Sequence, residues 1–270
     1  MFIKTRFFPM AIAVSITLFS SLLSFGATAA HHGVETEERN NNAESKGTVL
    51  ITGANRGIGL ALAANFDAAG YQVIGSARKP AKADALHKLG VQVEQLDVTD
   101  QVSVSALAER LKGVEIDILI NNAGISGKQS REMSTIDVDD MMRTLNVNTL
   151  GPVRVMQALL PNVALSQQKL IVNVSSMMGS LEMNTWGCCA GYRASKSALN
   201  SINQTFSVDF ADSGVAFVVM HPGYVQTDMN EGQGNITTDQ SAKGLMQVIT
   251  GLSAKDNGAY LDWEGKALPW

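Results

Sequence analysis

A glycine-rich turn constrains the fold of this 270-residue chain more than any other segment. The sequence Thr52-Gly-Ala-Asn-Arg-Gly-Ile-Gly59 follows the apolar run Val49–Ile51 and precedes a helical pattern that begins at about Ile58. Glycines between a strand and a helix permit a tight turn and let the backbone approach a ligand closely. The N–H groups at the start of the helix can then bind a pyrophosphate. The segment therefore predicts a nucleotide-binding fold.

Strand and helix patterns alternate through the rest of the chain. The predicted strands cover residues 49–51, 73–76, 91–96, 116–120, 170–174, 215–220 and 259–261. The predicted helices cover residues 58–69, 81–89, 102–111, 138–160 and 192–212. This order implies parallel strands joined by right-handed crossovers, with helices on both faces. We therefore expect one α/β domain over residues 47–270, a doubly wound Rossmann-type parallel sheet of about seven strands.

The N-terminal residues follow a different pattern. Met1–Arg6 is basic, an apolar stretch covers about 7–25, and small residues follow over Gly26–Ala30. This layout predicts a signal peptide over residues 1–29 and an exported protein, periplasmic or secreted. The alternative is an uncleaved anchor that attaches a cytosolic domain to a membrane, because the apolar stretch is near bilayer-spanning length. Residues 30–46 lack apolar periodicity and predict a polar linker.

Composition and charge exclude several function classes. The net charge of −4 gives no basic surface for nucleic acid. The two cysteines, Cys188 and Cys189, are adjacent, which fits the usual disulfide geometry poorly, so we expect no disulfide. We also expect no metal site. Whether the chain is a monomer or a homo-oligomer stays open at this stage.

The candidate cofactor-binding residues follow predicted strands, because doubly wound sheets bind ligands at the carboxyl ends of their strands. Within the glycine-rich turn they are Gly53, Asn55, Arg56, Gly57, Ile58 and Gly59. Beyond later strands they are Asp97, Val98, Asn122, Ala123, Gly124, Pro222, Gly223, Val225 and Thr227. Asp97 is placed to bind the adenine edge, and the Thr227 hydroxyl could hold a nicotinamide carboxamide.

The end of the second predicted strand distinguishes between the two nicotinamide dinucleotides. Proteins that bind NAD usually place an acid there for the ribose 2′-hydroxyl. Residues 75–79 contain no acid and carry two cations, Arg78 and Lys79. A 2′-phosphate would be attracted to them, and Arg56 can reach the same group. The pattern predicts NADP(H), and the alternative is that Arg78 and Lys79 are ordinary surface charges.

Four polar side chains form the candidate catalytic set. Tyr192 and Lys196 lie four residues apart and share a helix face, where the ammonium would lower the pKa of the phenol. A tyrosine altered in this way can serve as a general acid or base. Ser176 ends a strand and could polarise a carbonyl. Asn148 is an unfavourable residue inside a helix, which a side-chain amide holding a water near Lys196 would explain.

Together these motifs resemble the short-chain dehydrogenase/reductase family. The resemblance rests on the glycine-rich turn, Asn121-Asn-Ala-Gly124, Tyr192-x-x-x-Lys196 and the Pro222-Gly223 turn, and it covers about residues 47–270. The segments around Tyr192 and His221, and the ending Leu-Pro-Trp270, are most similar to the C-factor/sniffer-like carbonyl reductases.

The resemblance implies a function. Asn148, Ser176, Tyr192 and Lys196 would be the catalytic tetrad, with Tyr192 and Lys196 also touching the cofactor. The reaction would be hydride transfer between NADP(H) and a small-molecule carbonyl or alcohol. The alternative is an exported or anchored nucleotide-binding signalling protein of C-factor type, with catalysis secondary. A signal peptide favours that alternative, because NADPH is a cytosolic metabolite.

The segment Met177–Gly191 is predicted to form one wall of the substrate site, and we call it the substrate wall. Its candidate apolar contacts are Met177, Met178, Met183 and Trp186. These side chains could equally pack against one another as the core of the loop.

Overall fold

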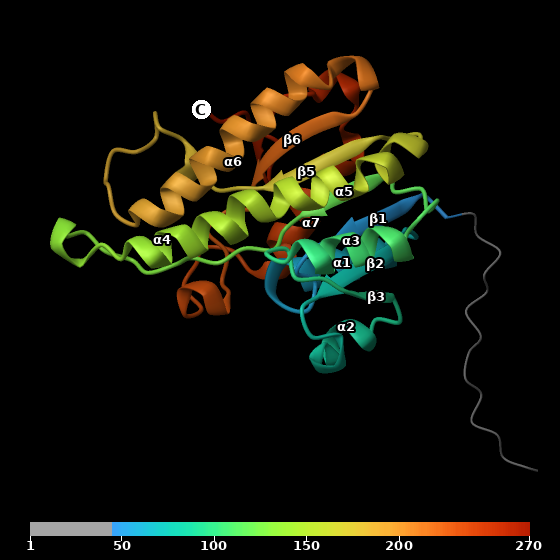
Figure 1. Cartoon of the computed structure of the whole chain (residues 1–270), viewed down its shortest axis with the longest axis horizontal. Helices are drawn as coiled ribbons and strands as arrows, with labels where there is room; N and C mark the ends of the chain where they lie inside the picture. Colours follow the sequence, from blue (N-terminus) through green and yellow to red (C-terminus); the bar gives the residue numbers. More distant parts are fainter. Residues whose placement is uncertain (1–44) are drawn as a thin grey trace, which may run out of the picture. The chain divides into compact units, whose positions relative to one another are not determined.

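Seven strands, most of them apolar, form one fully parallel sheet in the computed structural model, which describes residues 45–270 (Figure 1). The strands are β1 (Thr48–Ile51), β2 (Gln72–Ala77), β3 (Gln92–Gln95), β4 (Ile118–Asn121), β5 (Leu170–Val174), β6 (Ala216–His221) and β7 (Tyr260–Asp262). Their order in the sheet is β3-β2-β1-β4-β5-β6-β7, and every neighbouring pair is parallel. The predicted doubly wound Rossmann-type fold is confirmed.

Helices cover both faces of the sheet because successive strand residues point to opposite sides. In β1, Val49 and Ile51 join one core cluster and Leu50 joins the other. The first cluster packs against α1 (Gly57–Ala68) and α7 (Thr238–Gly251), and the second against α3 (Gln101–Arg110), α5 (Gly151–Leu165) and α6 (Ala190–Asp209). Burial on both faces explains why the strands read as continuous apolar runs.

The helix α7 was not among the predicted elements, although the sequence carries its signals. The Thr237 hydroxyl oxygen accepts a hydrogen bond from Gln240 N, and the Gln240 side-chain oxygen accepts one from Thr237 N. This capping box is a helix-start signature. Ala242, Leu245 and Ile249 then follow at helical spacing and are fully buried against α1.

The predicted long helix over residues 138–160 is three segments. It consists of α4 (Val138–Leu145), a π-helical turn η3 (Asn146–Leu150) and α5, which continues to Leu165. π-Helical turns inside helices are often found at functional sites. The predicted helix 81–89 is also shorter than expected, because only α2 (Asp84–His87) is α-helical there, after a 3₁₀ turn at Pro80–Lys82.

The expectation that the cysteines are not bonded is wrong, because Cys188 and Cys189 form a disulfide. Both residues have left-handed backbone, with φ of 73° and 60°. Their Cα atoms are 3.8 Å apart, below the separation usual for disulfides on which the expectation rested, and the bond spans the single peptide that joins the two residues.

The predicted signal peptide or anchor lies outside the described residues, as does most of the predicted linker. Export and membrane attachment therefore stay predictions. Within residues 45–270, no helix has the length and apolar character needed to cross a membrane.

Candidate active site

The glycine-rich turn and the segment after β4 are fastened to each other where the strand order reverses. The chain runs from β1 outward to β2 and β3, and then returns to β4 on the other side of β1. The Thr52 hydroxyl oxygen accepts hydrogen bonds from the backbone N of Asn122 and of Ala123, both at 3.0 Å. In return, the Asn122 amide donates to the carbonyls of Thr52 and Gly53. These contacts hold open the crevice in which such sheets bind ligands.

Two of the glycines are required by their surroundings. A Cβ on Gly59 would lie 2.4 Å from the Gly53 carbonyl oxygen, so only glycine permits this approach of helix and turn. Gly57 has a left-handed φ of 57°, and a Cβ there would meet only the Thr227 methyl group, at 3.8 Å. Thr227, which follows β6, therefore faces the glycine-rich turn.

The start of α1 is suited to an anion. Its N-cap, Arg56, makes no capping side-chain hydrogen bond, and its first turn contains no acidic residue. By contrast, the side chains of Asp100, Asp137 and Thr237 cap α3, α4 and α7. The first N–H groups of α1 therefore stay available for a phosphate, and the helix dipole favours a negative charge there. This arrangement fits a dinucleotide pyrophosphate.

Two of the predicted 2′-phosphate ligands, Arg56 and Arg78, are exposed cations in the turns that follow β1 and β2. Arg56 is exposed and pairs with Asp228 at 3.5 Å, a contact that an incoming anion can replace. Arg78 is exposed at the end of β2, near Asp97. Burial raises the pKa of Asp97, but hydrogen bonds from Thr99 and the charge of Arg78 outweigh it, so that the pKa is lowered overall. Asp97 is therefore a hydrogen-bond acceptor at neutral pH.

The predicted catalytic residues converge on the same crevice. Ser176 follows β5, Tyr192 and Lys196 lie on α6, and Asn148 lies in η3. The Lys196 Nζ donates to the Val174 carbonyl at 2.8 Å and lies 5.8 Å from the centre of the Tyr192 ring. A Cβ on Gly124 would lie 3.3 Å from the Asn148 Oδ1 and 3.8 Å from the Lys196 Nζ. The segment after β4 thus joins the two halves of the site.

Comparison with known proteins identifies the family. The short chain dehydrogenase model matches residues 47–237. The chain belongs to the short-chain dehydrogenase/reductase family. It is 36% identical over 230 residues to the 1-hydroxy-2-glutathionyl-2-methyl-3-butene dehydrogenase of Rhodococcus sp. (strain AD45), covering 83% of this chain and 99% of that one. It is 40% identical to the C-signal of Myxococcus xanthus over 155 residues, 57% of this chain and 93% of that one.

Solved structures give the same assignment. The carbonyl reductase from chicken fatty liver, whose structure contains NADPH, has a TM-score of 0.77 and 35% identity, with 84% of this chain and 100% of that chain covered. The carbonyl reductase Sniffer of D. melanogaster has a TM-score of 0.78 and 30% identity, with 83% and 99% covered. The structural neighbours of this short-chain dehydrogenase/reductase thus include NADP-bound enzymes.

Burial sets the protonation states in the site. It raises the pKa of Tyr192, while the Ser176 side chain acts in the opposite direction. It lowers the pKa of Lys196 to about 8, which leaves most of the ammonium charged at pH 7. The expected lowering of the tyrosine pKa by Lys196 is therefore not produced by the protein residues themselves, because burial dominates. Tyr192 is a neutral phenol that can donate a proton.

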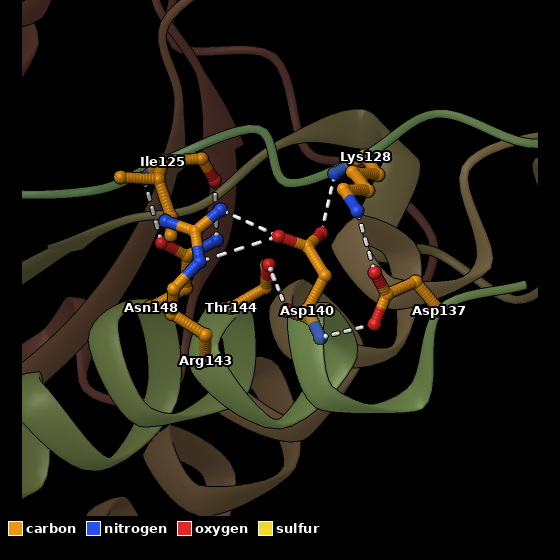
Figure 2. Close-up of polar contacts among 7 residues, drawn as sticks. All are labelled: Ile125, Lys128, Asp137, Asp140, Arg143, Thr144 and Asn148. Carbon is orange, nitrogen blue, oxygen red and sulfur yellow. Dashed lines mark hydrogen bonds and ion pairs between the residues drawn. The ribbon is translucent and has the colours of Figure 1, made fainter.

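The Asn148 amide fastens the segment after β4 to the helix (Figure 2). Its Oδ1 accepts from Ile125 N at 2.9 Å, and its Nδ2 donates to the Ile125 carbonyl at 2.8 Å and to the Ser195 hydroxyl at 3.0 Å. The side chain is fully buried, so these contacts explain an asparagine within the helix. A relay water held by this amide stays a prediction.

Asp140, two helical turns before Asn148, also connects the segment after β4 to α4. This contact was not predicted from the sequence. The Asp140 carboxylate accepts from Lys128 N and from the Arg143 guanidinium, as Figure 2 shows. These contacts lower its pKa, with the Lys128 N–H as the main cause. Asp137 caps the same helix and pairs with the Lys128 ammonium at 2.6 Å. The sequence signals only the Asp137 cap, because acids at the start of a helix often cap it, whereas the contact of Asp140 with Lys128 depends on tertiary packing.

Two further site residues were also missed. The hydroxyl of Tyr260, in β7, donates to the Ser176 carbonyl at 2.6 Å and thereby positions the backbone of the predicted catalytic serine. Arg193, beside Tyr192, donates to the carbonyls of Met178, Gly187 and Cys188. Its guanidinium lies 4.3 Å from the centre of the Trp186 ring. The buried Arg193 therefore connects Met178, Trp186, Gly187 and Cys188 of the substrate wall through polar and ring contacts.

Replacing Asp140, whose side chain is buried, by alanine removes the acceptor of the Lys128 N–H and of the Arg143 guanidinium. We expect a loss of about 1–3 kcal/mol in the free energy of unfolding, measured by urea denaturation. The matched control is Asp139→Ala, an exposed acid on the same helix, which is expected to stay within about 0.5 kcal/mol of the wild type. Equal losses in the two variants would contradict the role of Asp140.

The buried ammonium of Lys196 makes stability depend on pH. Burial lowers the pKa of Lys196 from its ordinary value of 10.5 to about 8, so the unfolded state holds more protons than the folded state between these limits. The free energy of unfolding of the wild type should therefore rise relative to Lys196→Met as pH increases from 8 to 10.5, by roughly 3 kcal/mol. Below pH 8 the difference should be constant. Denaturant melts of both proteins across this range measure it, and parallel curves throughout would contradict it.

Proposed function

We propose that this protein is an NADP(H)-dependent oxidoreductase that interconverts a small-molecule carbonyl compound and a secondary alcohol. The observation that carries the proposal is the convergence of Asn148, Ser176, Tyr192 and Lys196 beside the uncapped start of α1. Membership of the short-chain dehydrogenase/reductase family supports it, as do neighbours that are NADPH-bound carbonyl reductases.

The residues present fit the cofactor. The N-terminus of α1 would hold the pyrophosphate, and Arg56 and Arg78 would hold the 2′-phosphate. Asp97 would accept from the adenine edge, and Thr227 would bond the carboxamide. When bound, the nicotinamide ring supplies or accepts the hydride.

The catalytic residues would handle the oxygen and its proton. In the direction of reduction, the Ser176 hydroxyl donates a hydrogen bond to the substrate carbonyl. The neutral Tyr192 phenol then gives its proton to the oxygen as negative charge develops there. The Lys196 ammonium stabilises the phenolate that is left. In the direction of oxidation, the same phenolate would take the proton from the alcohol.

The signalling alternative is not favoured. A signalling protein in which catalysis is secondary has no need of a neutral phenol placed beside a serine hydroxyl and a buried ammonium group. Perturbed titratable groups of this kind gather at catalytic sites.

The first test removes the phenolic hydroxyl. Tyr192→Phe should retain NADPH binding and lose at least about a hundredfold in kcat for any carbonyl that the wild type reduces, because the proton donor is absent. Consumption of NADPH measures turnover, and a thermal shift with NADPH measures binding. The control is Tyr224→Phe, whose hydroxyl makes an exposed contact with Gln233. Normal turnover in Tyr192→Phe would refute the proposed role.

The second test concerns the choice of cofactor. Arg78→Glu places a carboxylate where the 2′-phosphate would lie, so the Kd for NADPH should rise at least about tenfold while that for NADH changes little. Lys88→Glu makes the same charge change at another exposed position and should affect neither cofactor. Equal weakening of both cofactors by Arg78→Glu would contradict the assignment.

A further inference from the structure

The adjacent cysteines occupy a sensitive place in the proposed active site. Cys188 and Cys189 lie near the end of the substrate wall, and α6 begins at the next residue, Ala190. Tyr192 follows within the first turn of that helix. Cys189 is buried, whereas Cys188 is only half-buried. A small thiol or disulfide from solvent would therefore reach the sulfur of Cys188 first.

The left-handed backbone of Cys188 and Cys189 depends on the bond between their sulfurs. Cys188 and Cys189 have φ of 73° and 60°, next to Gly187 at 66°. Glycine adopts this left-handed region freely, but residues with a side chain are disfavoured there, and a run of them is rare. The bond between the sulfurs closes a small ring that includes the peptide linking the two residues. Reduction would open this ring and release both residues from it.

Contacts on both sides link the pair to the substrate wall. The Cys188 carbonyl accepts from the Arg193 Nε at 3.1 Å, and Arg193 in turn stacks on Trp186. On the other side, Cys189 N donates to the Ser130 carbonyl at 3.2 Å. A change in the backbone of the pair would therefore displace the partners of Arg193. These contacts involve neither the glycine-rich turn nor the end of β2, where the pyrophosphate and the 2′-phosphate would bind.

We propose that Cys188 and Cys189 form a reversible oxidation site that controls the shape of the substrate wall. In the oxidising direction, the two thiols lose two protons and two electrons and form one S–S bond. An oxidised small-molecule disulfide takes up both and is cleaved to two thiols, and a dithiol reductant reverses the exchange. The disulfide form orders the wall for the carbonyl substrate. This inference rests on the proposed function for its kinetic consequence, but not for the oxidation itself.

The test compares the two states of the full chain. The protein is equilibrated with oxidised glutathione or with dithiothreitol, and alkylation followed by mass spectrometry counts the free thiols. Reduction should raise the KM for the carbonyl substrate by at least about threefold, the scale expected when one or two ordered residues are released. The KM for NADPH should stay unchanged. Equal carbonyl KM values in the two states would overturn the proposal.

The double variant Cys188→Ser/Cys189→Ser is the matched control. The chain has two cysteines, so this variant contains none. It should show the carbonyl KM of the reduced enzyme in both conditions, and a response to dithiothreitol that persists in it would overturn the proposal.

Tryptophan fluorescence separates this proposal from the proposed function. Reduction should change the emission of the wild type, and the change should be absent in Trp186→Phe and in the double serine variant. If no carbonyl is turned over in either state, the proposed function fails while this signal still tests the oxidation site. An emission that is independent of the thiol state would overturn the proposal.

Discussion

The reciprocal hydrogen bonds between Thr52 and the Asn122–Ala123 backbone are the contact on which the rest of the site depends. They join the ends of β1 and β4, the two strands between which the direction of chain progression reverses. A parallel sheet buried on both faces has unpaired backbone groups at its strand ends, and these need partners. Thr52 and Asn122 satisfy one another's hydrogen-bonding groups, so the ends of β1 and β4 are held in place before a ligand binds. The uncapped start of α1 opens into the crevice at these strand ends.

A second network of buried polar groups holds the catalytic half of the site. Asn148 ties the segment after β4 to η3, and Asp140 ties the same segment to α4. Partly satisfied polar networks are costly, whereas fully satisfied ones specify a single arrangement. Lys196 is the group whose burial destabilises the folded protein, since burial lowers its pKa and opposes its charge. This position places the ammonium beside the phenol of Tyr192.

The strands and most helices could be predicted because their signals are local. Apolar runs gave all seven strands, and the observed bounds differ from the predicted ones by up to two residues. The signals for α7 were equally local but were not used. The π-helical turn at Asn148 could not be predicted from periodicity, because it depends on Ile125 and Ser195, which come from other parts of the chain.

The site shows the same division. Motif residues such as Gly59, Ser176 and Tyr192 could be named in advance, since their chemistry and spacing are characteristic. The supporting roles of Asp140, Tyr260 and Arg193 could not be assigned, because each acts on backbone that is distant in sequence or lies in an irregular loop. Burial also raises the pKa of Tyr192, whereas the four-residue spacing from Lys196 predicts a lower pKa. Burial cannot be read from that spacing.

The sequence by itself determined the doubly wound fold, the glycine-rich turn and the set of reactive side chains. These follow from side-chain periodicity, glycine conformation and residue chemistry, which are properties of short segments. The tertiary structure decided the protonation of Tyr192 and Lys196, the organisation of the substrate wall by Arg193, and the bond between Cys188 and Cys189. These depend on burial and on backbone torsions, which are fixed only when separate segments pack together.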